Sequence, residues 1–324
     1  MIVGNIGTQV RNVGMSKYKV RYAVMSHSRE ANVPLMQDLT DKNLYWYVPK
    51  SQVQRYKDAG ARYVVGVTEE EVMPMKVQQQ NKALLDAHRV GAYLVMLDDD
   101  TESFEELTYK DSKSAKKRSV PMDYVTYKVI MELAESPYYL AGISRNQNPF
   151  FNNFKTNNAC MIHGQYRIFK PVKNVKDLIL SDESQNEWKR ISSLEDIDMS
   201  IAHMYFHKGV VRVESLWAIT PPSYYLNVGM HGGYNGDDED EVQANHEKRI
   251  ETFCSDMYML FTKWSDCEND ILGNGWDIKK GKTMQENKIK IPWRRLGNKG
   301  FAKNIKYATR NKYNPIIHNK YKTM

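Results

Sequence analysis

The stretch Tyr93–Asp100 reads YLVMLDDD, an apolar run that ends in three consecutive aspartates. A short, continuous apolar run is typical of a strand buried on both faces, as in a parallel sheet that is flanked by helices. Open α/β sheets bind ligands beyond the carboxyl ends of their strands, which is where these aspartates would lie. The stretch therefore predicts an α/β fold with an acidic ligand site at the end of a central strand.

The three aspartates are candidate metal ligands. Alternate side chains of an extended chain point the same way, so we expect Asp98 and Asp100 to converge while Asp99 faces elsewhere. Two carboxylates suit a Mg²⁺ or Mn²⁺ ion that bridges a diphosphate. The alternative is a solvated acidic turn, because aspartate is a common turn residue.

The sequence before this strand alternates between strands and helices. Runs of β-branched and aromatic residues predict strands, and apolar residues about 3.6 positions apart predict helices. We expect strands at 19–25, 43–48 and 63–67, and helices at 51–59 and 75–90 that are closed by Gly60 and Gly91. This order is typical of a parallel sheet with helices on both faces.

The sequence after the aspartates begins with a polar, basic segment, 109–119, which lacks periodicity and is expected to be a mobile loop. The same criteria then predict strands at 138–143 and 159–163 and helices at 123–136, 196–207 and 241–264.

The composition favours a globular protein. The chain has 324 residues, of which 41% are hydrophobic and 26% charged. No run of 18 apolar residues exists, and the first residues do not form a secretion signal, so we expect a cytoplasmic protein without a membrane segment. The three cysteines, Cys160, Cys254 and Cys267, fit neither a disulfide framework nor a zinc site and are expected to be reduced. No motif indicates an obligate protein partner.

The net charge of +7 is unevenly distributed along the chain. From Lys279 to the end there are 14 basic residues and one acidic residue, Glu286, which gives +13. Since the whole chain has 46 basic and 39 acidic residues, the other 278 residues carry 32 and 38, a net charge of −6. The C-terminal segment is therefore a distinct basic region.

The order of these features resembles the nucleotide-sugar half of a GT-A glycosyltransferase. The resemblance rests on a strand that ends in Ser26 and His27, a helix with Asn81 to Leu84 (NKAL), and VMLDDD at 95–100. It implies a UDP-sugar donor, a ribose contact from Asp98 or Asp99, and a Mn²⁺ or Mg²⁺ ion on Asp98 and Asp100. The donor-binding residues implied in this half are Ser26, His27, Arg29, Asn81, Lys82, Asp98 and Asp99. Family members often carry an arginine before the asparagine of that helix, where this chain has Gln80.

The second half contains SLEDIDMSIAH at 193–203, which resembles the acidic helix start that holds the general base in this family. Asp196 matches the base, which would take a proton from the acceptor hydroxyl. Glu195 and Asp198 would position the acceptor or brace the site, and Arg145, from the GISR stretch at 142–145, would neutralise a phosphate of the donor or of the acceptor. The alternative for the acidic residues is helix capping, and for Arg145 a structural salt bridge. His231, in a glycine-rich stretch, resembles a late metal ligand of some GT-A enzymes, and a hinge is the alternative.

The basic C-terminal segment interleaves its charges with aromatic residues, which indicates a nucleic-acid partner. The candidate contacts are Lys116, Lys117, Arg118, Arg294 and Arg295. The motif order at 19–235 is also similar to that of phage-type DNA base glycosyltransferases, which add sugars to hydroxymethylated pyrimidines. This similarity implies DNA as the acceptor, for example at 5-hydroxymethylcytosine.

We therefore expect a GT-A type α/β fold with a Rossmann-like mixed sheet and a basic C-terminal extension. Residues 1–268 would be the catalytic domain, with a nucleotide-sugar half at 19–107, an acceptor half at 120–235 and a helix at 241–265, and 269–324 the extension. The expected function is metal-dependent transfer of a sugar from a UDP-sugar to DNA, with inversion. Three alternatives remain: a glycosyltransferase for polysaccharide or protein, a two-metal nuclease, and a noncatalytic nucleic-acid module.

Overall fold

A computed structural model describes residues 17–68, 75–180 and 194–220, together with Asp256, Leu260 and two short strands near the C-terminus. The described residues up to Asp98 hold four strands and three α-helices: β1 Val20–Met25, α2 Val33–Gln37, β2 Leu44–Pro49, α3 Val53–Asp58, β3 Tyr63–Val67, α4 Met75–Arg89 and β4 Tyr93–Asp98. The remaining elements are β5 Ser103–Lys110, β6 Ala115–Val120, α5 Met122–Glu135, β7 Leu140–Ser144, β8 Thr156–Asn157, β9 Tyr166–Phe169, α6 Glu195–His207, β10 Val211–Ile219, β11 Asp277–Lys279 and β12 Lys288–Lys290. Short 3₁₀ helices are η1 Glu30–Asn32, η2 Lys50–Gln52, η3 Pro149–Phe151 and η4 Val175–Asp177.

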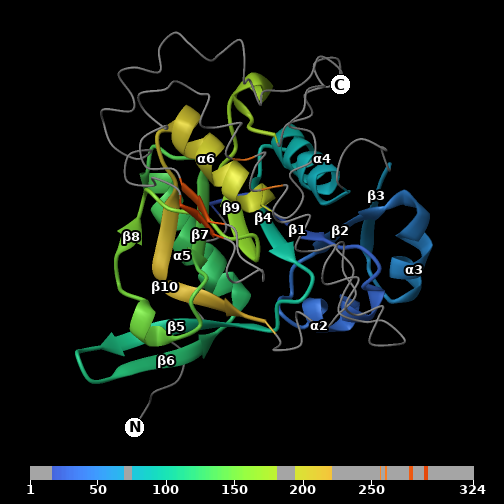
Figure 1. Cartoon of the computed structure of the whole chain (residues 1–324). Coiled ribbons are helices and arrows are strands. Elements are labelled where there is room, and N and C mark those ends of the chain that lie inside the picture. Colours follow the sequence, from blue (N-terminus) through green and yellow to red (C-terminus); the bar gives the residue numbers. More distant parts are fainter. Residues whose placement is uncertain are drawn as a thin grey trace.

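Ten strands of the described residues form one mixed sheet in the order β3-β2-β1-β4-β9-β7-β10-β5-β6, with β8 paired to β10 (Figure 1). The first four are parallel, as the alternation of strands and helices predicted. Beyond β4 the sheet becomes mixed, because β9 runs antiparallel to both β4 and β7. Strands from both halves of the sequence therefore lie in a single sheet.

The strand β4 lies near the middle of this sheet, and its apolar run is buried on both faces. Leu94 and Met96 pack in a core cluster with residues of α4 and α6. Val95 and Leu97 point the other way, into a cluster with residues of α5, α2 and α3. This two-sided burial explains why the strand reads as a continuous apolar run.

Residues 109–119 do not form the expected mobile loop. They make up most of a hairpin between β5 and β6, which pairs through β5 with β10. Ion pairs across the hairpin join Lys117 to Glu105 at 2.8 Å and Arg118 to Glu106 at 2.6 Å. A strand at the edge of a sheet can be held by such charged pairs rather than by an apolar face, so hydrophobic periodicity gave no signal for it.

The strand expected at 159–163 is also wrong, and β9 begins only at Tyr166. The backbone of this segment bonds to side chains of α6 and to the side chain of Arg212 on β10, instead of pairing with the backbone of a neighbouring strand. Ser200 Oγ accepts a hydrogen bond from Ile162 N at 2.9 Å, and Asp196 Oδ2 accepts one from Gly164 N at 3.1 Å. This segment is therefore attached to the beginning of α6.

The expected helices at 75–90, 123–136 and 196–207 are confirmed as α4, α5 and α6. Of the helix expected at 241–264, the structure describes Asp256 and Leu260, which are helical and buried. Cys160 is a free, buried thiol, and Cys254 and Cys267 lie outside the described residues. Within the described part of the chain, every helix is too short or too polar to cross a lipid bilayer.

Candidate active site at the carboxyl edge of the sheet

Several chain segments meet at the carboxyl ends of β1 and β4. Ser26 follows β1, and Asp98 is the last residue of β4. Because β9 is antiparallel to β4, its amino end lies at the same edge, and Asp98 N donates a hydrogen bond to Gln165 O at 3.3 Å. The first residues of α6 reach this edge through the bond between Asp196 and Gly164. The topology thus brings four separate segments together.

One part of the site is an ion-pair cluster after β1 and β4. Arg29 Nη1 lies 2.9 Å from Asp99 Oδ1 and 3.2 Å from Asp100 Oδ2. Ser26 Oγ donates a hydrogen bond to the other oxygen of Asp99, and Tyr56 Oη lies 2.5 Å from Ser26 Oγ. Asp99 and Asp100 are both buried, so Arg29 partly balances two carboxylates withdrawn from water.

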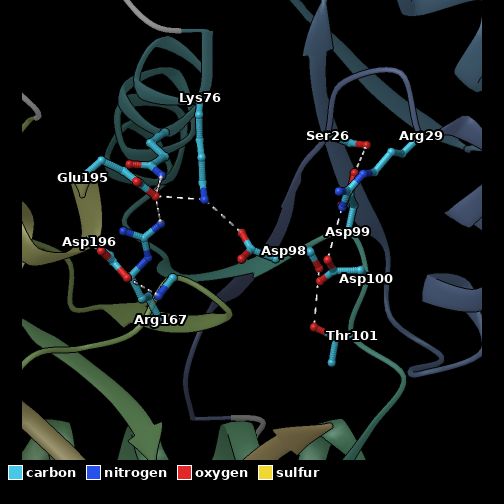
Figure 2. Close-up of polar contacts among 12 residues, drawn as sticks. Ser26, Arg29, Lys76, Asp98, Asp99, Asp100, Thr101, Arg167, Glu195 and Asp196 are labelled. Carbon is cyan, nitrogen blue, oxygen red and sulfur yellow. Dashed lines mark hydrogen bonds and ion pairs between the residues drawn. The ribbon is translucent and has the colours of Figure 1, made fainter. Parts of the chain in front are cut away.

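The expectation that the side chain of Asp99 faces away from that of Asp100 is wrong. Asp99 and Asp100 share Arg29, whereas Asp98 turns toward Lys76 on α4 (Figure 2). The physical reason is that β4 ends at Asp98, and a turn begins at Asp99, so the alternation of an extended chain does not continue.

A second part of the site joins β4 to α6. Lys76 Nζ lies 3.5 Å from Asp98 Oδ1 and 2.9 Å from Glu195 Oε1. Gln80, one turn further along α4, donates a hydrogen bond from Nε2 to the same oxygen of Glu195 at 3.3 Å. Glu195 is almost fully buried, so these contacts satisfy a carboxylate that water does not reach.

Three carboxylates surround Gly164. A methyl group at its Cα would lie 3.7 Å from Asp196 Oδ2, 3.7 Å from Asp98 Oδ2 and 3.8 Å from Glu195 Oε1. Only hydrogen occupies this position in glycine, so all three carboxylates approach the side of Gly164 on which a side chain would lie. The acidic residues of β4 and of α6 therefore belong to one site.

Arg167 on β9 lies beneath these acids and is 1% exposed. Its Nη2 is 3.9 Å from Glu195 Oε1, and none of its three guanidinium nitrogens donates a hydrogen bond to a described residue. Figure 2 shows this guanidinium between Glu195 and Asp196. Together, Lys76 and Arg167 place two positive charges among the three carboxylates.

Burial and charge shift the acids of the site in different directions. Burial raises the pKa of Glu195, but Lys76 and Arg167 outweigh it and lower this pKa to about 2. Burial, followed by the neighbouring charge of Glu195, raises the pKa of Asp196. Burial, with the charges of Asp98 and Asp99, raises the pKa of Asp100 to about 7. Glu195 is therefore a fixed negative charge, whereas Asp196 has the raised pKa that suits a general base.

The other residues expected in the site lie on several elements around this cluster. His27 directly follows Ser26, Asn81 is buried on α4, and Asp198 is buried on α6. Lys82 forms an ion pair with Asp86 on its own helix. Arg145 is exposed just after β7, and His231 lies outside the described residues.

The basic residues expected to bind nucleic acid fall on the hairpin or outside the described part of the chain. Lys116, Lys117 and Arg118 lie on β6, where Lys117 and Arg118 make the cross-strand ion pairs and Lys116 Nζ lies 6.0 Å from the ring centre of Tyr109. Arg294 and Arg295 are not among the described residues.

The sequence did not point to Lys76, Gln79, Gly164 or Arg167. Gln79 donates a hydrogen bond from Nε2 to Ser26 O at 2.7 Å, so it ties α4 to the end of β1. Polar residues occupy positions 76, 79 and 80 of a helix that otherwise faces the core. This pattern could have indicated that these residues belong to the site, because polar side chains on a buried face need hydrogen-bond partners.

A divalent cation is compatible with the aspartates. Asp100 Oδ1 is buried and has no hydrogen-bond partner among the described residues, so one carboxylate oxygen is available to a ligand. Within the described residues, no three His, Cys, Asp or Glu side chains are placed so that together they could hold one metal ion. Mg²⁺ is commonly held by one or two carboxylates plus substrate phosphates, and this donor set fits that mode.

Fold and site together define a mixed α/β protein with a charged, largely buried acidic site at the carboxyl edge of its sheet. No protein-family model matches the chain, and no curated protein matches it significantly.

Among solved structures, the chain is similar to a mycobacterial protein, with a TM-score of 0.42 and 10% identity over 86% of this chain and 85% of that one. It is also similar to mannose-1-phosphate geranyltransferase from Thermus thermophilus, with a TM-score of 0.25 and 13% identity over 48% of this chain and 51% of that one. Both scores are too low to establish a shared fold or activity.

Proposed function

We propose that this protein is a glycosyltransferase that moves a sugar from a UDP-sugar to a hydroxyl of a modified DNA base, such as 5-hydroxymethylcytosine. The observation that carries the proposal is the gathering of Asp98, Glu195 and Asp196 around Gly164, where the aspartates after β4 meet the acidic start of α6. Such a site can hold a donor on one side and deprotonate an acceptor on the other.

The donor side is assigned to the residues after β1 and β4. Asp98 or Asp99 would accept hydrogen bonds from the ribose hydroxyls, and Ser26, His27 and Arg29 would line the nucleotide. Asn81 of α4 would contribute from the neighbouring helix, whereas Lys82 pairs with Asp86 and is a weaker candidate. The ammonium group of Lys76 lies at this edge of the sheet, beside Asp98 and Glu195. It would therefore offer a positive charge to the diphosphate of a donor bound there.

Asp98 and Asp100 would hold a Mn²⁺ or Mg²⁺ ion, with His231 as a further candidate ligand. The unpartnered oxygen of Asp100 and the raised pKa of its carboxyl support this assignment, because crowded carboxylates are stabilised by a cation. When bound, such an ion neutralises the negative charge of the departing UDP.

Asp196 is assigned as the general base. As the acceptor oxygen forms its bond to the anomeric carbon, its proton passes to Asp196, and the bond between that carbon and the UDP oxygen breaks. Gly164 N bonds to one oxygen of Asp196 and so fixes its orientation. Direct displacement of this kind inverts the anomeric carbon. Asp198 and Arg145 are assigned to the acceptor side, and Glu195, which contacts Lys76 and Gln80, is assigned to brace the site.

The test is mass spectrometry of DNA after incubation with the full chain, Mn²⁺ and a panel of UDP-sugars. We expect 5-hydroxymethylcytosine DNA to gain the mass of one sugar per modified base and cytosine DNA to gain none. The Asp196→Asn variant should lose transfer by about 10²–10⁴-fold while it still binds UDP, since only the proton acceptor is removed.

Two outcomes would replace the proposal. If UDP is released only with a polysaccharide or protein acceptor, the fold and donor remain and the DNA acceptor is wrong. If plasmid is cut with Mn²⁺ in the absence of any UDP-sugar, the carboxylates serve a nuclease.

A further inference from the structure

Three phenylalanines are exposed in the loop between β7 and β8, residues 145–155. Phe150, Phe151 and Phe154 are 48%, 69% and 60% exposed. Phenylalanine is among the residues most often buried, and several exposed rings close together in sequence mark a surface that another molecule covers. We call residues 145–155 the phenylalanine loop.

The exposure of these rings is built into an ordered loop. Asn152 is fully buried, and its side chain bonds to Ser144 Oγ at 2.6 Å and to Asn146 O at 2.8 Å. Asn148 caps η3 by accepting a hydrogen bond from Phe150 N at 3.0 Å. The backbone is therefore fixed by polar contacts, and the rings are held outward.

The phenylalanine loop lies against the β5–β6 hairpin. Lys110 Nζ, at the end of β5, donates hydrogen bonds to Phe150 O and Asn152 O, both at 2.6 Å. Tyr109 beside it is 46% exposed, and Lys113 and Lys116 are exposed in the turn and on β6. Residues 103–120 and 145–155 together contain seven basic and three acidic side chains, a net charge of +4. Exposed rings and positive charge thus share one surface.

We propose that the phenylalanine loop and the β5–β6 hairpin form a binding surface for single-stranded nucleic acid. The rings would stack on unpaired bases, and Lys113 and Lys116 would contact phosphates. Phenyl rings offer no hydrogen bonds, so they suit the flat faces of bases, which a duplex covers and a single strand exposes. This surface would also hold opened DNA while one base is withdrawn from the stack.

The hairpin joins this surface to the acidic site. β5 begins at Ser103, three residues after Asp100, and its eight residues span about 24 Å at 3.4 Å per residue. A strand of nucleic acid that follows the hairpin can therefore be bound at one end and present a nucleotide near the carboxylates. In naming DNA as the ligand, the inference rests on the proposed function, but the binding itself does not require transfer.

The test is fluorescence anisotropy of a short labelled single-stranded oligonucleotide with the full chain, without any UDP-sugar. We expect the triple variant Phe150→Ala, Phe151→Ala, Phe154→Ala to bind at least about tenfold more weakly, with an unchanged salt slope, because stacking releases no counterions. The double variant Lys113→Ala, Lys116→Ala should reduce the slope of log K against log salt by about 1.4, since each phosphate contact on a single strand contributes about 0.7.

Matched controls are Val90→Ala, an exposed apolar residue after α4, and Lys57→Ala, an exposed lysine of α3, which should bind like the wild type. Thermal unfolding checks that each variant is folded. If the folded phenylalanine variant binds as tightly as the wild type, or if duplex DNA of the same sequence binds more tightly than the single strand, the inference is wrong. If the phenylalanine variant binds more weakly but the wild type transfers no sugar, the glycosyltransferase proposal is wrong and the binding surface for single-stranded nucleic acid is supported.

Discussion

The ammonium group of Lys76 lies 2.9 Å from the carboxylate of Glu195, a residue more than 100 positions further along the chain. Lys76 is the second residue of α4, in the first half of the chain, and Glu195 is the first residue of α6, in the second half. Lys76 also reaches Asp98, so one cation connects the acids of both halves. The charge balance of the site depends on this contact.

Replacing Lys76 with Met should destabilise the fold by roughly 3 kcal/mol, because Glu195 would keep a buried charge without its nearest cation. Urea unfolding measures this change. Lys82→Met is the matched control on the same helix, since Lys82 makes a partly exposed pair with Asp86 worth about 0.5 kcal/mol or less. If both substitutions change the free energy of unfolding equally, the buried contacts of Lys76 stabilise the fold no more than the partly exposed pair does.

The rate of transfer should rise with pH through the raised pKa of Asp196, because the base acts only when it has lost its proton. Glu195→Gln should shift this acid limb to lower pH, since the negative charge of Glu195 helps to raise the pKa of Asp196. The profile of kcat/KM against pH is the measurement. If the folded variant keeps its acid limb at the same pH as the wild type, the charge of Glu195 does not raise the pKa of the base.

Gly164→Ala should fold like the wild type and lose about ten- to a hundredfold in activity. Its methyl group would make ordinary contacts at 3.7–3.8 Å, but it would fill the space between the three carboxylates and displace a reacting group. Gly142→Ala is the contrasting variant, because its methyl group would lie 2.5 Å from Ile162 Cγ2 and force β7 to shift. Melting temperatures and transfer rates of both should separate the two effects. If Gly164→Ala keeps full activity, the reaction does not take place beside Asp98, Glu195 and Asp196.

His203 gives the fold its own pH dependence. Burial, followed by the charge of His207, holds the pKa of His203 well below its usual value, so the folded protein keeps it neutral. In the unfolded chain His203 binds a proton below about pH 6.5. Its contribution to the stability of the fold is therefore fully present above that pH and is lost as the pH falls below it. The melting temperature of His203→Leu should decline less on acidification than that of the wild type. Parallel declines would contradict this.

Local patterns in the sequence were enough to place the central strand and the acids. The run YLVMLDDD combines two-sided burial with an abrupt change to aspartate, and both properties belong to neighbouring residues. The helices α4, α5 and α6 were predictable for the same reason, since a 3.6-residue spacing is visible within a few turns.

Only the tertiary structure decided which side chains share the site. Lys76, Gly164 and Arg167 are separated from one another or from the aspartates by many residues, and the strand order β4-β9-β7 brings them together. The β5–β6 hairpin was missed because cross-strand ion pairs, not an apolar face, hold its outer strand. Hydrophobic periodicity reports the burial of a residue within its own element, whereas charge pairing between distant elements depends on the order of strands in space. For this reason the sequence by itself determined the strand that carries the acids, and the fold determined their partners.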